Sequence, residues 1–236
     1  MTTKEKIRFL ILRSIGNFLV LFALFGVAAT FGPALYYEAA YQTMKIRGVN
    51  FTVENQAQAT QKNSTASDQT QVRGNLNLVD SLSGPKEKIL VPIDTNFNLL
   101  IPKIGANARV FSSVDPSSPD RFLPILQKGV AHAAGTFFPG QKGNIYLFAH
   151  STDNFWDVGR YNATFYLLKD LQEGDDVVIF FKDVRHDYRV VRTQVTSASE
   201  VSYLTHAQTE KELLILQTCW PPGTTWQRLL VFAEPI

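Results

Sequence analysis

The sequence predicts a mainly β domain that follows one membrane-spanning helix. Two features indicate this: an uncharged apolar stretch near the amino end, and a carboxyl-terminal part made of short apolar runs with turn residues between them. Many short strands of this kind favour a barrel or a sandwich over alternating strands and helices. The chain is therefore expected to hold an anchor, a linker and one all-β domain with short helices.

The apolar stretch runs from Ser14 to Tyr37 and contains no charged residue. As a helix that rises about 1.5 Å per residue, it is long enough to cross the roughly 30 Å hydrocarbon core of a bilayer. It exceeds the apolar core of an ordinary signal peptide, and no persuasive small-X-small cleavage site follows it. A long buried helix of a soluble protein is the alternative, but such a helix should show a polar face. Residues 14–37 are thus predicted to be a transmembrane signal anchor.

Charge on the two sides of this stretch predicts its orientation. Four basic residues precede it with one acidic residue opposing them: Lys4, Lys6, Arg8 and Arg13 against Glu5. The positive-inside bias then gives a cytoplasmic tail over 1–13 and a single-pass protein of the cell membrane whose carboxyl-terminal domain is extracytoplasmic. Three tyrosines at the outer end are candidates for an interfacial aromatic anchor: Tyr36, Tyr37 and Tyr41.

Residues 38–88 are predicted to be an extracytoplasmic flexible linker. Between Gln56 and Thr70, Gln, Asn, Ser and Thr crowd together with almost no large apolar residue. Such a segment cannot bury enough surface to offset its ordering entropy. The remaining residues, 89–236, number about 150, which suffices for one ordinary domain with its own core.

The β pattern begins after Pro85. One or two helical turns are expected at Ala163–Leu168, and Asp183–Asp187 is expected to join two strands in a hairpin. The expected strands are Phe97–Ile101, Ala108–Phe111, Gly143–His150, Asp176–Lys182, Tyr188–Val195, Leu213–Cys219 and Arg228–Ala233.

The single cysteine, Cys219, points to the chemistry. It ends an apolar run, a Pro/Gly loop follows it, and Arg228 lies nine residues later inside a second apolar run. A free thiol has a pKa of about 8.5, so it needs ionising help to act as a nucleophile at neutral pH. A lone cysteine with a basic partner and a distant histidine is a candidate covalent catalyst. A buried structural cysteine is the alternative.

Several separated motifs resemble those of the sortases, the membrane-anchored cysteine transpeptidases of bacterial cell surfaces. The family's signature strand ends in Thr-Leu-X-Thr-Cys, and residues 215–219 read Ile-Leu-Gln-Thr-Cys, which departs only at the first position. Residues 143–151, Gly-Asn-Ile-Tyr-Leu-Phe-Ala-His-Ser, resemble the strand that presents the family's catalytic histidine. With further similar segments at 101–108 and 129–140, the resemblance covers roughly residues 97–236.

This resemblance implies an eight-stranded sortase-like β-barrel over 89–236 and a catalytic set of His150, Cys219 and Arg228. Cys219 would attack a peptide bond of an LPxTG-like sorting signal and form a thioester. His150 would protonate the departing amine and later deprotonate the incoming one. Arg228, whose guanidinium stays charged, would donate hydrogen bonds to the substrate and to the oxyanion.

Other residues near these motifs have weaker assignments. Thr218 is expected to shape the substrate groove. Trp220 and Trp226, in the loop between Cys219 and Arg228, fit either the lining of an apolar groove or the packing of the loop onto the barrel. His132 is the rival general acid because it too lies in a sortase-like segment, but the resemblance places the catalytic histidine at the end of the Gly-Asn-led strand. His186 and His206 are expected to be solvated.

No metal or other cofactor is expected, because the implied mechanism needs none. The expected partners are a sorting-signal peptide, an amine nucleophile from a peptidoglycan precursor or a pilin, and the membrane through residues 14–37. A net charge of +2 gives no electrostatic case for nucleic acid. Three alternatives remain: a cysteine peptidase or hydrolase of the same fold, a peptidoglycan L,D-transpeptidase, whose Ser-X-Gly-Cys-X-Arg-like segment is lacking here, and a non-catalytic membrane-tethered binding module.

Overall fold

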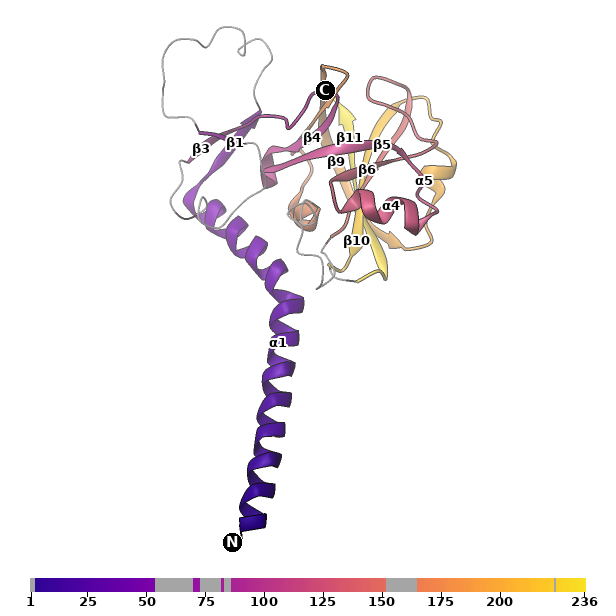
Figure 1. The fold of residues 1–236 in the computed structure, drawn as a ribbon. Helices are drawn as coiled ribbons and strands as arrows, with labels where there is room; N and C mark the ends of the chain where they lie inside the picture. Colours follow the sequence, from indigo (N-terminus) through magenta and orange to yellow (C-terminus); the bar gives the residue numbers. More distant parts are fainter. Residues whose placement is uncertain (1–2, 54–69, 73–81, 83–85, 152–164, 223) are drawn as a thin grey trace.

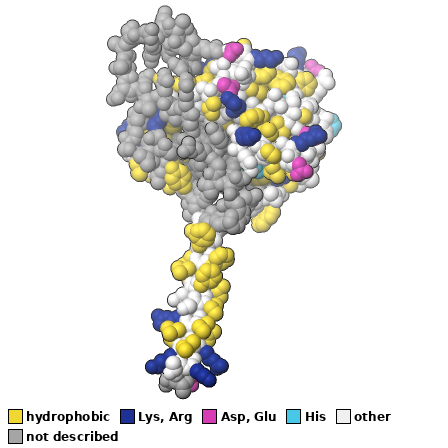
Figure 2. Space-filling model, viewed as in Figure 1, with side chains coloured by type: hydrophobic (Ala, Val, Ile, Leu, Met, Phe, Trp, Pro, Cys, Tyr) yellow, Lys and Arg dark blue, Asp and Glu magenta, His cyan; other side chains and the backbone are white. Residues whose placement is uncertain are grey.

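A computed structural model describes residues 3–53, 70–72, 82, 86–151, 165–222 and 224–236. Its first element is the long helix α1 (Thr3–Arg47), which projects away from a barrel (Figure 1). Over Thr3–Ala28 this helix is apolar and long enough to cross a bilayer, and none of that window is buried. Figure 2 shows hydrophobic side chains along this free part, with Lys and Arg gathered near its amino end. One amino-terminal candidate for a membrane span is therefore present, as expected.

Eight strands close into a barrel in the order β10-β11-β9-β8-β4-β5-β6-β7, which confirms the predicted fold class. Every expected strand is present, β4 with the expected bounds and the others with somewhat different ones, and the short β6 is an additional strand. The barrel strands are β4 (Phe97–Ile101), β5 (Ala106–Val114), β6 (Val130–Ala133), β7 (Gly143–Phe148), β8 (Asp176–Phe181), β9 (Val184–Ser197), β10 (Glu212–Trp220) and β11 (Gln227–Pro235).

Strand directions define the two ends of the barrel. β7 and β10 pair in parallel, whereas β11 runs antiparallel to β10. The pairings of β5 with β4 and β6, and of β6 with β7, make β4 parallel to β7 as well. The carboxyl ends of β4, β7 and β10 therefore share one end with the start of β11. We call this end, which holds Cys219, the thiol end.

The barrel core explains why β7 is an almost continuous apolar run, with Asn144 as its polar residue. All six residues of β7 are buried. Ile145 and Leu147 belong to the interior cluster, whereas Tyr146 and Phe148 belong to a second cluster on the outer face. The short helices α4 (Pro119–Leu126) and α5 (Ser202–Thr205) supply partners to this outer cluster. A strand that is covered on both faces shows a continuous apolar run rather than alternation.

The end of α1 is docked on the barrel, which differs from the flexible linker expected from residue 38 onward. Ala40, Tyr41 and Met44 are buried, and Glu38 Oε2 lies 2.7 Å from Lys169 Nζ. Tyr41 therefore packs in the protein and is not an interfacial anchor. Residues three and four apart share one helix face, so this short stripe suffices to dock the last turns of α1.

The buried face at the end of α1 lies against two short 3₁₀ helices. They are η1 (Pro102–Ile104) and η2 (Tyr166–Asp170), and the latter is close to the helical turns expected at Ala163–Leu168. Tyr41 shares one buried cluster with Ile104 and Leu168 from these two turns. Because η1 directly follows β4, α1 is docked at the thiol end.

A small parallel sheet continues from α1. Its order is β1-β3-β2, with β1 at Asn50–Val53, β2 at Thr70–Val72 and β3 at Glu87–Leu90. Leu90 packs with Leu100, Val178 and Phe180 of the barrel. The described parts of the predicted linker are thus helix and strand attached to the barrel, while its segments 54–69, 73–81 and 83–85 lie outside the described residues.

Candidate active site

Cys219 lies near the end of β10, a strand that pairs with β7 on one side and with β11 on the other. Its side chain is partly exposed. In the β10–β11 register Cys219 stands directly opposite Arg228. The spacing of nine residues in the sequence is therefore a hairpin that brings the thiol and the guanidinium to adjacent strands.

His150 follows β7 at the same end. The β7–β10 ladder ends at the pair Phe148 and Gln217. Beyond it, the Ala149 N–H donates to the Gln217 carbonyl at 3.1 Å, and Thr218 Oγ1 donates to the Ala149 carbonyl at 3.2 Å. These two bonds continue the parallel pairing by one residue, so His150 comes at the level of Cys219.

Burial sets the protonation of His150. Its side chain is half-buried, and desolvation lowers the pKa of the imidazole because burial disfavours the charged form. The neutral ring is therefore the favoured state near neutral pH.

Arg228 is held by its own hairpin. Its Nη1 donates to the Thr225 carbonyl at 3.1 Å and to the Gln227 carbonyl at 2.9 Å. The guanidinium has further N–H donors on Nε and Nη2. The side chain is half-buried, so its charge acts in a partly desolvated setting next to the thiol strand.

The three residues expected near the substrate have different environments. Thr218 is buried, and its hydroxyl binds the Ala149 carbonyl. Trp220 is partly buried and packs against the interior cluster. Trp226 is 75% exposed in the loop that precedes β11. The sequence left the two tryptophans open between loop packing and groove lining, and the structure packs only Trp220.

The rival histidine, His132, is built into the barrel wall. It is 1% exposed on β6. Its Nδ1 accepts a hydrogen bond from the Ser113 N–H at 3.3 Å, which leaves the proton on Nε2 to be donated to the Phe137 carbonyl at 2.9 Å. Its ring also stacks on Phe138 at 4.5 Å between centroids. With both nitrogens engaged, His132 is a structural residue.

The remaining histidines lie elsewhere. His206, which caps α5, is exposed as expected, whereas His186 is half-buried within β9 rather than in a loop. Among the residues that the structure describes, no group of three or more His, Cys, Asp or Glu comes together as a metal site.

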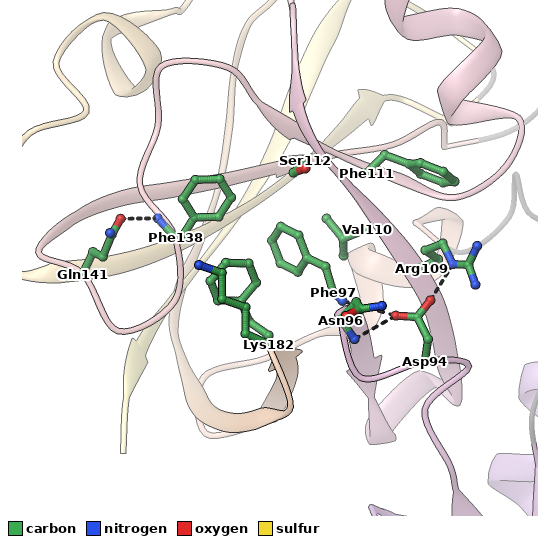
Figure 3. A pocket seen from close by; sticks show the side chains of 11 residues that line it. Asp94, Asn96, Phe97, Arg109, Val110, Phe111, Ser112, Phe138, Gln141 and Lys182 are labelled. Carbon is green, nitrogen blue, oxygen red and sulfur yellow. Dashed lines mark hydrogen bonds and ion pairs between the residues drawn. The ribbon is translucent and has the colours of Figure 1, made fainter.

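A cavity of about 590 Å³ lies at the other end of the barrel (Figure 3). It is lined by residues before and within β4, in mid β5, at the end of β8 and in the loop before β7, including Phe97, Phe138, Lys182 and the ion pair of Asp94 with Arg109. These segments are the starts of β4 and β7 and the end of β8, all opposite the thiol end. The cavity is therefore separate from the cysteine chemistry.

The hydrogen bond from the Thr218 hydroxyl to the Ala149 carbonyl was not predicted from the sequence. Thr218 was expected to shape a groove, but it lies inward and ties the cysteine strand to the histidine strand. Its partner is a backbone carbonyl that is 69 residues away and carries no side-chain signal.

Comparison with known proteins decides the family. A model of the sortase domain matches residues 99–236, which is more than half of the chain. The chain belongs to the sortase family. It is 28% identical over 141 residues to sortase D of Bacillus subtilis (strain 168), an alignment that covers 58% of this chain and 62% of that relative.

Solved sortases share the barrel. Sortase C-1 from Actinomyces oris matches with a TM-score of 0.51 and 25% identity, covering 61% of this chain and 76% of that one. The Group B Streptococcus Pilus Island 1 sortase C2 matches with a TM-score of 0.50 and 25% identity, covering 59% and 73%. The expected sortase family and sortase barrel are confirmed.

Proposed function

We propose that this protein is a sortase-type cysteine transpeptidase in which His150, Cys219 and Arg228 form the catalytic set. The observation that supports this most strongly is the parallel pairing of β7 with β10, extended by the Thr218 and Ala149 bonds. It sets a histidine, a thiol and an arginine on three neighbouring strand ends. Retention of the full set in a sortase barrel argues against a non-catalytic binding module.

Acylation begins at Cys219. The thiolate attacks the carbonyl carbon of the scissile peptide bond, and a tetrahedral oxyanion forms. The carbon–nitrogen bond then breaks, the departing amine takes a proton from the His150 imidazolium, and a thioester to Cys219 remains. Because burial lowers the pKa of His150, the imidazolium that this step needs is the minor form at neutral pH.

Deacylation reverses these roles. The incoming amine gives a proton to neutral His150 and attacks the thioester carbonyl, and the carbon–sulfur bond breaks to restore the thiolate. The lowered pKa of His150 favours this step, since the neutral base is the abundant form. Water in place of the amine would make the protein a cysteine peptidase.

Arg228 is assigned to the oxyanion. Its bonds to the loop carbonyls fix the guanidinium at the start of β11, opposite Cys219. The N–H groups on Nε and Nη2 then serve as donors to the tetrahedral intermediates and to substrate carbonyls. A fixed donor costs little reorganisation when charge develops, which is how such groups lower a barrier.

The substrate is proposed to be an LPxTG-like sorting signal of a surface protein. Trp220, which is packed at the end of β10 beside the nucleophile, is assigned to the floor of the groove, with Trp226 at the rim. Thr218 acts on the groove indirectly, through Ala149.

The acceptor is proposed to be an amine of the cell wall, from a peptidoglycan precursor or a pilin lysine. The pilus island in the name of one structural relative supports the second source.

The membrane arrangement follows from α1. We propose a cytoplasmic tail over residues 1–13, a single membrane span over residues 14–37 and an extracytoplasmic catalytic domain. The apolar window of α1 over Thr3–Ala28 supports the span. The basic residues near the amino end support this orientation.

The test is mass spectrometry of the full-length protein in detergent with an LPxTG-type peptide library and glycine or lysine amines as acceptors. An amide-linked product is expected, and it should be lost in Cys219→Ala and in His150→Ala. His206→Ala, which removes an exposed histidine far from the site, is the matched control. A Cys219 thioester that yields only hydrolysis would indicate the peptidase. The absence of any Cys219 adduct would indicate the binding module.

A further inference from the structure

Helix α1 connects its apolar span to the barrel without a break. All of Thr3–Arg47 is helical, and Ala40 is the first fully buried side chain among those that the structure describes after the candidate span. From Ala28 to Ala40 the rise is about 18 Å at about 1.5 Å per residue. A continuous helix of this length holds the barrel close to whatever surface its apolar part enters.

The docked end of α1 also fixes which side of the barrel faces that surface. Tyr41 packs with Ile104 and Leu168, and Glu38 pairs with Lys169, all at the thiol end. Figure 1 marks the carboxyl terminus at the barrel end that lies away from the free part of α1. Because β11 runs from the thiol end to that terminus, the thiol end faces the free part of α1.

Exposed apolar side chains occur at this same end. Trp226, just before β11, is 75% exposed. Val195, which pairs with Leu229 near the start of β11, is 43% exposed. Tryptophan is the residue most typical of the membrane–water interface, where its ring lies among the headgroups.

We propose that the thiol end lies against the surface of the phospholipid bilayer, with Trp226 in the headgroup region. This inference rests on the proposed anchoring through α1. The site formed by His150 and Cys219 then lies close to the membrane surface.

The test places a fluorescent probe at each end of the barrel. In the full chain carrying Cys219→Ala, a single cysteine is introduced by Trp226→Cys or by Val184→Cys and labelled with an environment-sensitive dye. Val184 is 54% exposed and begins β9 at the end opposite Cys219, so it is the matched control. A third variant, Val195→Cys, probes the thiol end with Trp226 kept in place.

Each labelled protein is reconstituted in phosphatidylcholine vesicles with nitroxide-headgroup lipid, and the vesicles are isolated by flotation. Quenching is expected to be several-fold stronger at positions 226 and 195 than at 184, and detergent should abolish the difference. Equal, weak quenching at all three positions in floated vesicles would overturn the proposal. A protein that fails to float would refute the anchoring instead. Neither outcome depends on turnover, so catalysis is judged separately.

Discussion

Replacing Thr218 by valine tests whether the link between the cysteine strand and the histidine strand matters. Valine keeps the shape of threonine and removes only the hydroxyl that donates to the Ala149 carbonyl at 3.2 Å. A buried hydrogen bond contributes about 1 kcal/mol net, and this one lies beyond the last ladder pair, where few other bonds hold Ala149. A loss of about 1 kcal/mol corresponds to a fall of about 2–4 °C in melting temperature for a domain of this size.

The same loss of about 1 kcal/mol should also lower the rate of peptide turnover. If all of that energy positions His150 against Cys219 in the transition state, kcat/KM falls roughly fivefold. Thermal unfolding and peptide turnover measure the two effects, with Thr193→Val as the control. Thr193 is exposed on β9, so its replacement should change stability by less than about 0.5 kcal/mol. If Thr218→Val has the same melting temperature and the same peptide turnover as the parent, this hydrogen bond has no role in stability or catalysis.

Four further outcomes are expected. Arg228→Lys should leave a large defect in peptide turnover, because a point charge lacks the planar fork; near-normal turnover would remove the proposed oxyanion role. NMR titration of His150 should give a midpoint below the free value of about 6.5, and a midpoint above it would contradict the desolvation argument. His132→Phe should cost about 2 kcal/mol in urea unfolding, since it orphans the Ser113 N–H and the Phe137 carbonyl, without changing turnover per folded molecule. Because burial also lowers the pKa of His132, parent stability should be complete above about pH 6.5 and fall below it, and His132→Phe should weaken that fall.

The sequence predicted those parts of the fold that depend on local pattern. The nearly continuous apolar run over β7 and the run that ends at Cys219 were both predicted as strands, since a strand that is covered on two faces shows few polar positions. The hairpin after β8 was placed too late. Its turn is Lys182 and Asp183, both at positive φ, and the charged residues after it are part of β9. Arg185 and Asp187 pair two positions apart on one face, a contact that outweighs their weak preference for strands.

Docking of α1 could not be predicted in this way. Tyr41 and Met44 make a stripe too short to be distinguished from the end of a membrane span, and their partners on η1 and η2 lie far along the chain. The short strand β6 was missed for a similar reason, because four residues show little periodicity. The candidate site depended less on such contacts, since residue types and motif order predicted its members before any geometry was available.

The parallel pairing of β7 with β10 has a consequence for biogenesis. Parallel neighbours need a long connection, so His150 and Cys219 come from segments that are made well apart in time. Before β10 pairs with β7, a growing chain carries the histidine but no aligned thiol. On the proposed mechanism, barrel closure and the onset of reactivity are thus one event. On that mechanism a chain that is still being made, or one whose last two strands have come loose, cannot cut its neighbours.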